Sequence, residues 1–108
     1  MKILYKLLLI VIFLAIQSCA KDTKETNQIK ELNQEQEMIS TYNEALEFID
    51  RGDSFYAAKK FLEAELLFPQ SDWAPKSALM ASYSYYSENY YEEAIFNLER
   101  FIKTYPKD

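Results

Sequence analysis

Apolar residues recur at helical spacing over the part of the chain that follows Met38. They stand three and four residues apart, which is the period of one face of an α-helix. The runs break near Asp50, Phe68, Ser87 and Thr104, and these breaks predict four helices. The pattern therefore predicts an all-α fold with two helical hairpins, the first over residues 40–69 and the second over residues 70–108.

Turn residues at the breaks support these boundaries. Gly52 is expected to end the first helix in the left-handed conformation, and Asp53 or Ser54 to cap the second. Asn89 is expected to open the fourth helix, because Glu92 three residues later completes a capping box.

The two hairpins repeat each other at a shift of 37 residues. Small residues then coincide where two helices should touch, large ones where they should interlock, and proline where each unit ends. The coinciding pairs are Ala45 and Ser82, Phe48 and Tyr85, Gly52 and Asn89, Ala57 and Ala94, Phe61 and Leu98, and Pro69 and Pro106. This repeated order of small residues, large residues and proline resembles the tetratricopeptide repeat. An unrelated four-helix bundle is the alternative.

The amino-terminal segment has the pattern of an export signal. Lys2 and Lys6 precede an apolar run from Leu7 to Ile16, and this run is too short to cross a hydrocarbon core. Residues 1–18 are therefore predicted to be a signal peptide. The segment 16–19 resembles a bacterial lipobox, which implies that Cys19 is acylated and anchors the mature chain to a membrane. An ordinary signal peptide beside an incidental cysteine is the alternative.

Residues 19–39 follow as a polar segment that carries the lipidated cysteine and is too poor in apolar residues to fold alone. We expect a flexible tether here. The alternative is a helical extension of the next element from about Gln28 onward, because the glutamates, glutamines and lysines of this stretch tolerate a helix.

Composition and charge exclude several kinds of site. The chain has no histidine and only one glycine, so no imidazole-based catalytic pair, imidazole metal site or glycine-rich phosphate loop is expected. A formal charge of −5 argues against nucleic acid as a partner. No cofactor and no metal are expected. Glu63 and Glu65 are interpreted as ordinary helix-surface charges without an acid–base role.

Four segments together resemble the BamD (ComL) family of β-barrel assembly lipoproteins. They are Tyr42-Asn43-Glu44-Ala45-Leu46, Phe68-Pro69-Gln70-Ser71, Tyr83-Ser84-Tyr85-Tyr86 and Arg100-Phe101-Ile102-Lys103. The resemblance covers residues 40–108, which correspond to the first two of the family's five units. It implies that further repeats follow in a longer protein. A second chain covering the apolar last helix is the alternative.

The resemblance also implies a function. The protein would be a scaffold without catalysis, held by its lipid at the periplasmic face of the outer membrane, where Ala20 after the cysteine favours its transport. It would bind the barrel-forming outer membrane assembly protein and other assembly lipoproteins, and help to fold and insert unfolded outer membrane proteins. A periplasmic repeat lipoprotein linked to peptidoglycan or cell division is the alternative.

The first helix of each hairpin is expected to line a peptide groove. In the repeat register the candidate groove residues are Tyr42, Leu46, Ile49, Asp50, Leu79, Tyr83 and Tyr86. The resemblance implies that this groove receives the carboxy-terminal strand of an unfolded barrel protein. The alternative is that these tyrosines only pack between the hairpins.

Overall fold

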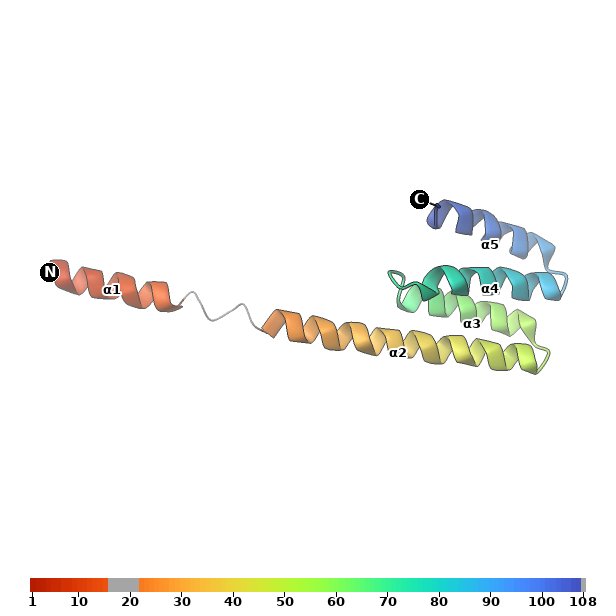
Figure 1. The fold of residues 1–108 in the computed structure, drawn as a ribbon, viewed down its shortest axis with the longest axis horizontal. Coiled ribbons are helices and arrows are strands. Elements are labelled where there is room, and N and C mark those ends of the chain that lie inside the picture. Colours follow the sequence, from red (N-terminus) through yellow and green to blue (C-terminus); the bar gives the residue numbers. More distant parts are fainter. Residues whose placement is uncertain (16–21, 108) are drawn as a thin grey trace. The chain divides into compact units, whose positions relative to one another are not determined.

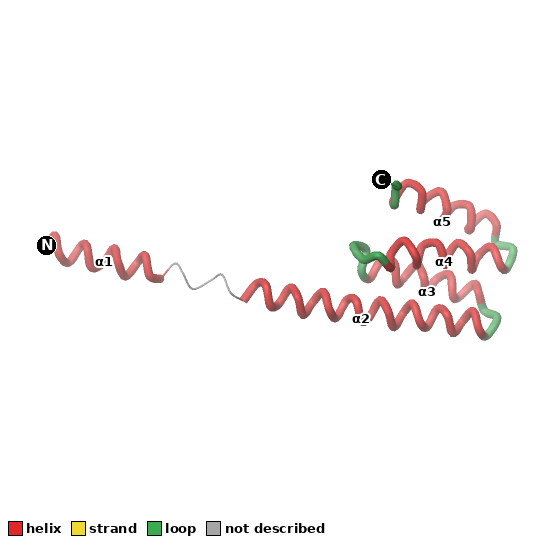
Figure 2. Tube along the Cα trace, in the orientation of Figure 1, coloured by secondary structure: helices red, strands yellow, loops and turns green. Residues whose placement is uncertain are grey.

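The computed structural model describes the backbone of residues 1–15 and 22–107, and the side chains of residues 1–9 and 26–107. The described residues form helices and no strand, so the all-α fold is confirmed (Figures 1 and 2). The helices are α1 (Lys2–Ala15), α2 (Asp22–Asp50), α3 (Ser54–Leu67), α4 (Trp73–Ser87) and α5 (Tyr91–Thr104). The chain divides into two compact units, Met1–Glu31 and Leu32–Asp108.

The amino-terminal unit contains α1, the helix of the predicted signal peptide. Among the described residues, no helix combines the length and the hydrophobicity that a membrane span requires. The predicted lipidation site Cys19 lies outside the described residues.

The prediction of a flexible tether over residues 19–39 is wrong for residues 22–39, which are helical. Helix α2 runs without a break from Asp22 to Asp50. The alternative, a helical extension, is what the structure has, and it begins earlier than Gln28. Glutamate, glutamine and lysine dominate this stretch, and their high helix propensity allows the helix to continue beyond the packed part of the chain.

The first hairpin packs against α4 through small buried residues. Ala45 on α2, Ala57 and Phe61 on α3 and Ala81 on α4 form one buried cluster, and each is fully buried. Alanine at three of these four positions lets the helices approach closely, and the Phe61 ring fills the space between them. This cluster joins the two hairpins into one body.

A second cluster holds α5 to α3 and α4. It consists of Ala58, Tyr85 and Ala94, with Phe55 and Leu62 packed against it. Figure 1 shows α5 beside α4 at the end of the stack.

The outer face of α5 is apolar and exposed. Leu98, expected to interlock as Phe61 does, is instead 41% exposed, because it lies on this face. Ile95 and Ile102, three residues before and four residues after Leu98, are exposed on the same face. Phe96 is also exposed, on another side of the helix.

The turns of the two hairpins have the same geometry. The amide of Asp53 donates to the Phe48 carbonyl (2.8 Å), and the amide of Tyr90 donates to the Tyr85 carbonyl (3.0 Å). These are the long hydrogen bonds of a Schellman turn, whose central residue is left-handed. Gly52 has φ +81° and Asn89 has φ +67°, so the positions matched by the 37-residue shift share one conformation.

The prediction that Asn89 opens the fourth helix with a capping box is therefore wrong. Asn89 ends α4 in the left-handed conformation, which asparagine tolerates better than most residues. Helix α5 begins at Tyr91 instead, and its N-cap residue Tyr90 makes no side-chain capping bond. The cap expected at the first turn is present, since an oxygen of Asp53 accepts a hydrogen bond from the Tyr56 amide (3.4 Å).

We expect Gly52→Ala to lower the free energy of unfolding by about 1 kcal/mol, because a left-handed residue with a Cβ is strained. A Cβ at Gly52 meets no atom within 4 Å, so the cost is that of the backbone alone. Gly52→Asn should therefore cost less than Gly52→Ala. Urea unfolding followed by circular dichroism measures both, and equal costs for the two variants would contradict this explanation.

Candidate functional site

One side of α4 presents an apolar and phenolic surface, which we call the α4 face and define as Leu79, Tyr83 and Tyr86. These residues are spaced four and three apart, so they form one stripe along the helix. Their exposed fractions are 43%, 58% and 61%. The other sides of α4 carry small buried residues that pack against the neighbouring helices. They include Ala74, Ser77, Ala78, Ala81, Ser82 and Ser84.

The candidates on α2 divide into two groups. Leu46 and Asp50 are exposed and one turn apart, as groove residues would be. Tyr42 and Ile49 are half-buried and pack against the Ala45–Phe61 cluster. These two positions therefore fit the alternative reading, packing between the hairpins.

The Tyr42 ring lies inside that packing. It makes edge-on contacts with the rings of Phe61 (centroids 4.9 Å apart) and Trp73 (5.2 Å). Burial raises the pKa of Tyr42. Tyr42 thus packs between the two hairpins and is not part of an open surface.

Further side chains bound the α4 face at its two ends. The Tyr86 ring lies 5.5 Å from the ring of Tyr91, whose hydroxyl donates to the Asn89 side chain (2.7 Å). Towards the start of α4, the Lys76 ammonium lies 4.9 Å from the centre of the Trp73 ring. Exposed tyrosines offer flat apolar area together with a hydroxyl that can bond a peptide backbone. The α4 face can therefore bind an extended polypeptide.

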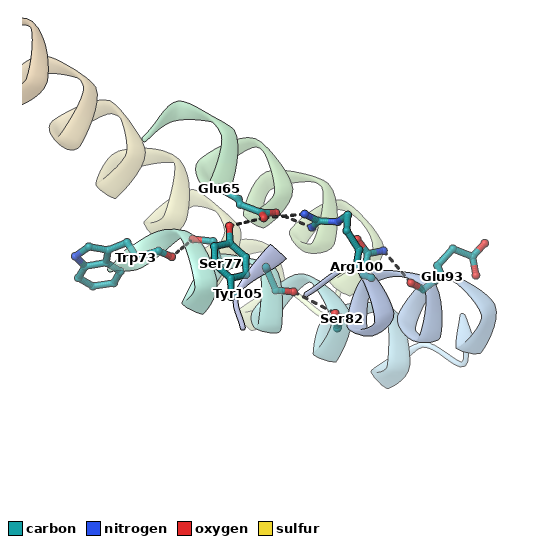
Figure 3. Close-up of polar contacts among 9 residues, drawn as sticks. Glu65, Trp73, Ser77, Ser82, Glu93, Arg100 and Tyr105 are labelled. Carbon is teal, nitrogen blue, oxygen red and sulfur yellow. Dashed lines mark hydrogen bonds and ion pairs between the residues drawn. The ribbon is translucent and has the colours of Figure 1, made fainter. Parts of the chain in front are cut away.

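Buried serines allow α4 to pack closely without leaving polar groups unsatisfied. The hydroxyls of Ser77, Ser82 and Ser84 donate to backbone carbonyls one turn earlier in the helix, at 2.9, 3.1 and 2.7 Å. Figure 3 shows the bonds made by Ser77 and Ser82. The small side chains on the packed sides of α4 thus let the neighbouring helices approach closely, and this packing positions the α4 face.

A buried polar network joins α3 to the end of α5 (Figure 3). We call it the Glu65 clamp and define it as Glu65, Arg100 and Tyr105. Both guanidinium nitrogens of Arg100 bond the two Glu65 oxygens, at 2.8 and 2.7 Å, and the Tyr105 hydroxyl donates to the same carboxylate at 2.7 Å. The Glu65 side chain is 6% exposed and that of Arg100 is 33% exposed. Two-point pairing of this kind fixes orientation as well as distance.

The network shifts the acidities of its members. Burial acts to raise the pKa of Glu65, but the hydrogen bonds from Arg100 and Tyr105 outweigh it and hold the pKa below that of a free glutamate. Burial and the hydrogen bond to Glu65 raise the pKa of Tyr105 to about 12. Glu65 is thus held as a carboxylate and Tyr105 as a neutral phenol.

The interpretation of Glu65 as a surface charge is wrong. Phe61, Glu65 and Phe68 are spaced four and three apart, which places Glu65 on the packed face of α3. That spacing is the signal in the sequence that could have identified it. Its partner is 35 residues away, so the pairing itself depends on the fold.

A second contact between the hairpins caps a helix. A carboxylate oxygen of Glu88, at the end of α4, accepts a hydrogen bond of 2.6 Å from the Ser54 amide at the start of α3. A carboxylate at a helix amino terminus satisfies a free amide and interacts favourably with the helix dipole. Within the described residues no group of three metal-ligating side chains gathers.

Comparison with known proteins gives consistent results. A family described as "YfiO: Outer membrane lipoprotein" matches residues 34–108. The chain is 32% identical over 97 residues to the outer membrane protein assembly factor BamD of Caulobacter vibrioides, covering 90% of this chain and 31% of that relative. It is also 32% identical over 98 residues to BamD of Rickettsia prowazekii, covering 91% and 37%. The chain thus spans about a third of the length of these relatives. No solved structure matches it.

Proposed function

The chain belongs to the YfiO family of outer membrane lipoproteins, and we propose that it serves as a non-catalytic scaffold in outer membrane protein assembly. The family places it at the outer membrane. The proposal extends this to lipid anchorage at the periplasmic face. Its partners would be the barrel-forming assembly protein, other assembly lipoproteins and unfolded outer membrane proteins.

One structural observation carries the proposal: the α4 face is apolar, phenolic and open. Leu79, Tyr83 and Tyr86 stand in one row, and the helix beneath them is held by packing on its other sides. A rigid helix with exposed tyrosines suits the capture of an extended chain that ends in aromatic residues. We propose that this face receives the carboxy-terminal strand of an unfolded barrel protein.

Co-purification distinguishes this proposal from a role in peptidoglycan or cell division. The full chain, tagged at its carboxy terminus, is isolated from membranes that have been solubilised in mild detergent. The proposal expects a large outer membrane barrel protein to be recovered with it. Recovery of cell-wall components or division proteins without a barrel protein would favour the other role.

Replacing Cys19 tests the anchor. We expect Cys19→Ala to accumulate as an unprocessed precursor and to be lost from the acylated pool, because the thioether and the new amino terminus both require the cysteine. Several acyl chains hold a protein firmly, since each buried CH₂ contributes about 0.8 kcal/mol. The measurement is metabolic labelling with a fatty acid, followed by fractionation. A Cys19→Ala protein that is still matured and membrane-bound would contradict the anchor.

Replacing two exposed tyrosines tests the α4 face. We expect Tyr83→Ala with Tyr86→Ala to weaken binding of a peptide from the last strand of a barrel protein by about tenfold or more, as removal of aromatic anchors does. Fluorescence anisotropy measures the affinity, and circular dichroism checks that helicity is unchanged.

The matched control for this pair is Tyr56→Ala. Tyr56 on α3 is 55% exposed, close to the 58% of Tyr83, but it lies outside the α4 face. The Tyr56→Ala protein should bind the peptide as the unaltered chain does. Equal affinity for the unaltered chain, the double variant and Tyr56→Ala would overturn the assignment of the α4 face.

A further inference from the structure

A hollow lies between α3, α4 and α5, away from the α4 face. Its volume is about 440 Å³, and it is open to solvent. It is lined by Leu62, Tyr85, Glu92, Glu93, Phe96 and Asn97. The wall is mainly apolar, and the polar groups come from a tyrosine, an asparagine and two glutamates. The hollow belongs to neither the α4 face nor the Glu65 clamp.

Two largely buried side chains in this wall have unpartnered oxygens. Tyr85 is 7% exposed and Asn97 is 6% exposed. The Asn97 amide nitrogen donates to the Glu93 carbonyl (2.8 Å), but its side-chain oxygen has no donor among the described residues, and the Tyr85 hydroxyl has no partner there either. No fully buried polar side-chain atom in the described part lacks a partner. Both oxygens therefore reach accessible surface, and the hollow is the cavity that their side chains line.

The charge at the hollow is negative and is not neutralised by the chain. Glu92 and Glu93 form no ion pair among the described residues. Glu93 and Tyr85 both line the hollow. Burial and the charge of Glu93 raise the pKa of Tyr85. Acidic residues in the first turn of a helix are stabilised by free amides, so the two carboxylates alone would need no ligand. The unpartnered Tyr85 and Asn97 oxygens are the independent observation that points to one.

Basic side chains of the same helices are engaged elsewhere. Arg100 bonds Glu65, Lys60 bonds Glu44 and Glu63, and the Lys59 ammonium lies 4.8 Å from the centre of the Phe55 ring. Lys103 lies nearly two turns further along α5 than Phe96. The hollow therefore presents four groups that accept hydrogen bonds and no charged donor of its own.

We propose that this hollow binds an arginine side chain of a partner polypeptide. Guanidinium carries five N–H donors and no acceptor, which matches two carboxylates, an amide oxygen and a phenol oxygen. Its aliphatic stem suits the Leu62 side of the wall, and its planar head stacks on aromatic rings such as that of Phe96. Phe96 is 67% exposed and thus free to make this contact.

The test is a titration of the full chain, labelled with ¹⁵N, with acetyl-arginine amide as the probe. We expect saturable shifts of the backbone amides of Glu93 and Asn97, with a dissociation constant on the order of millimolar for a single side chain. Acetyl-norleucine amide, which has a similar stem and no charge, should bind at least about tenfold more weakly, a difference of about 1.4 kcal/mol. No localised shift up to about 50 mM arginine probe, or equal binding of norleucine, would overturn the proposal.

Variants locate the site. Glu92→Gln with Glu93→Gln should weaken arginine binding by about tenfold or more, since charge-assisted bonds are the strong ones. The matched control Glu99→Gln removes an exposed carboxylate of the same helix that does not line the hollow, and it should bind as the unaltered chain does. Equal loss in both proteins would show non-specific attraction to an acidic chain and would overturn the site. The outcome is independent of the α4 face.

Discussion

Replacing Phe61 by alanine is expected to lower the free energy of unfolding by about 4 kcal/mol, within the range measured for large aromatic side chains removed from cores. Phe61 is fully buried and stands among Ala45, Ala57 and Ala81. The three alanines cannot extend into the space, and the Tyr42 ring beside Phe61 is also packed against Trp73, so a cavity remains. The free energy of unfolding of a domain is only about 5–15 kcal/mol. The loss caused by Phe61→Ala is therefore a large fraction of the total, and we expect it to raise the unfolded population strongly.

Urea unfolding followed by circular dichroism measures this effect. The control is Ile102→Ala on the outer face of α5, where the side chain is 69% exposed and should contribute little. A cost below about 1 kcal/mol for Phe61→Ala would place the core elsewhere. Comparable costs for the two variants would show that the outer face of α5 is covered in solution.

Replacing Arg100 of the Glu65 clamp by alanine is expected to lower the free energy of unfolding by about 2 kcal/mol. Breaking a buried pair leaves an uncompensated charge, which costs about 3–5 kcal/mol when both partners are buried. The Arg100 side chain is 33% exposed, so solvent screens part of the effect and the smaller figure applies. Chemical unfolding of Arg100→Ala measures the loss.

Arg51 provides the matched control for Arg100. Its guanidinium bonds Glu47 at 2.9 Å, but both side chains are 65% exposed. Pairs of this kind contribute about 0–1 kcal/mol, so Arg51→Ala should be close to neutral. If Arg51→Ala cost as much as Arg100→Ala, burial of the Glu65 clamp could not be the source of its contribution.

The Glu65 clamp also predicts how stability depends on pH. The pKa of Glu65 is lower in the folded chain than the ordinary value of 4.5, so its contribution is present above that value and is lost as the pH falls through the folded pKa. The pKa of Tyr105 rises from 10.0 to about 12, so its contribution is present below pH 10.0 and is lost as the pH rises towards 12. Tyr105→Phe should reduce the alkaline loss of stability and leave the part due to Tyr42 and Tyr85, whose pKa values are also raised by burial. Urea unfolding between about pH 8 and pH 11 measures the difference.

Helix boundaries were predictable from the sequence where the signals were local. The spacing of apolar residues predicted that a helix ends near Ser87, and α4 ends at that residue. The turn at Gly52 was equally predictable, because glycine is the residue that most readily adopts a left-handed conformation. Asn89 was misread because asparagine suits both a helix start and a left-handed end. Only the repeat alignment with Gly52 distinguishes these two roles.

Contacts between distant residues were not predictable in the same way. Spacing alone could place Glu65 on a packed face, but its pairing with Arg100 and Tyr105 requires that α3 and α5 be neighbours. The same holds for the bond from the Ser54 amide to Glu88. Among the groove candidates, the repeat register marked Tyr42 and Tyr83 alike. The two side chains differ in the structure, because the Tyr42 ring packs against the Trp73 ring while the Tyr83 side chain is exposed to solvent.

Site-specific photocrosslinking tests whether the α4 face binds polypeptides during outer membrane protein assembly. A photoreactive phenylalanine analogue replaces Tyr83 in the full chain, and a second protein carries it at Tyr56. After irradiation of living cells, we expect adducts with outer membrane barrel proteins at position 83 and none at position 56. Absence of such adducts at position 83, or equal adducts at both positions, would contradict binding at the α4 face.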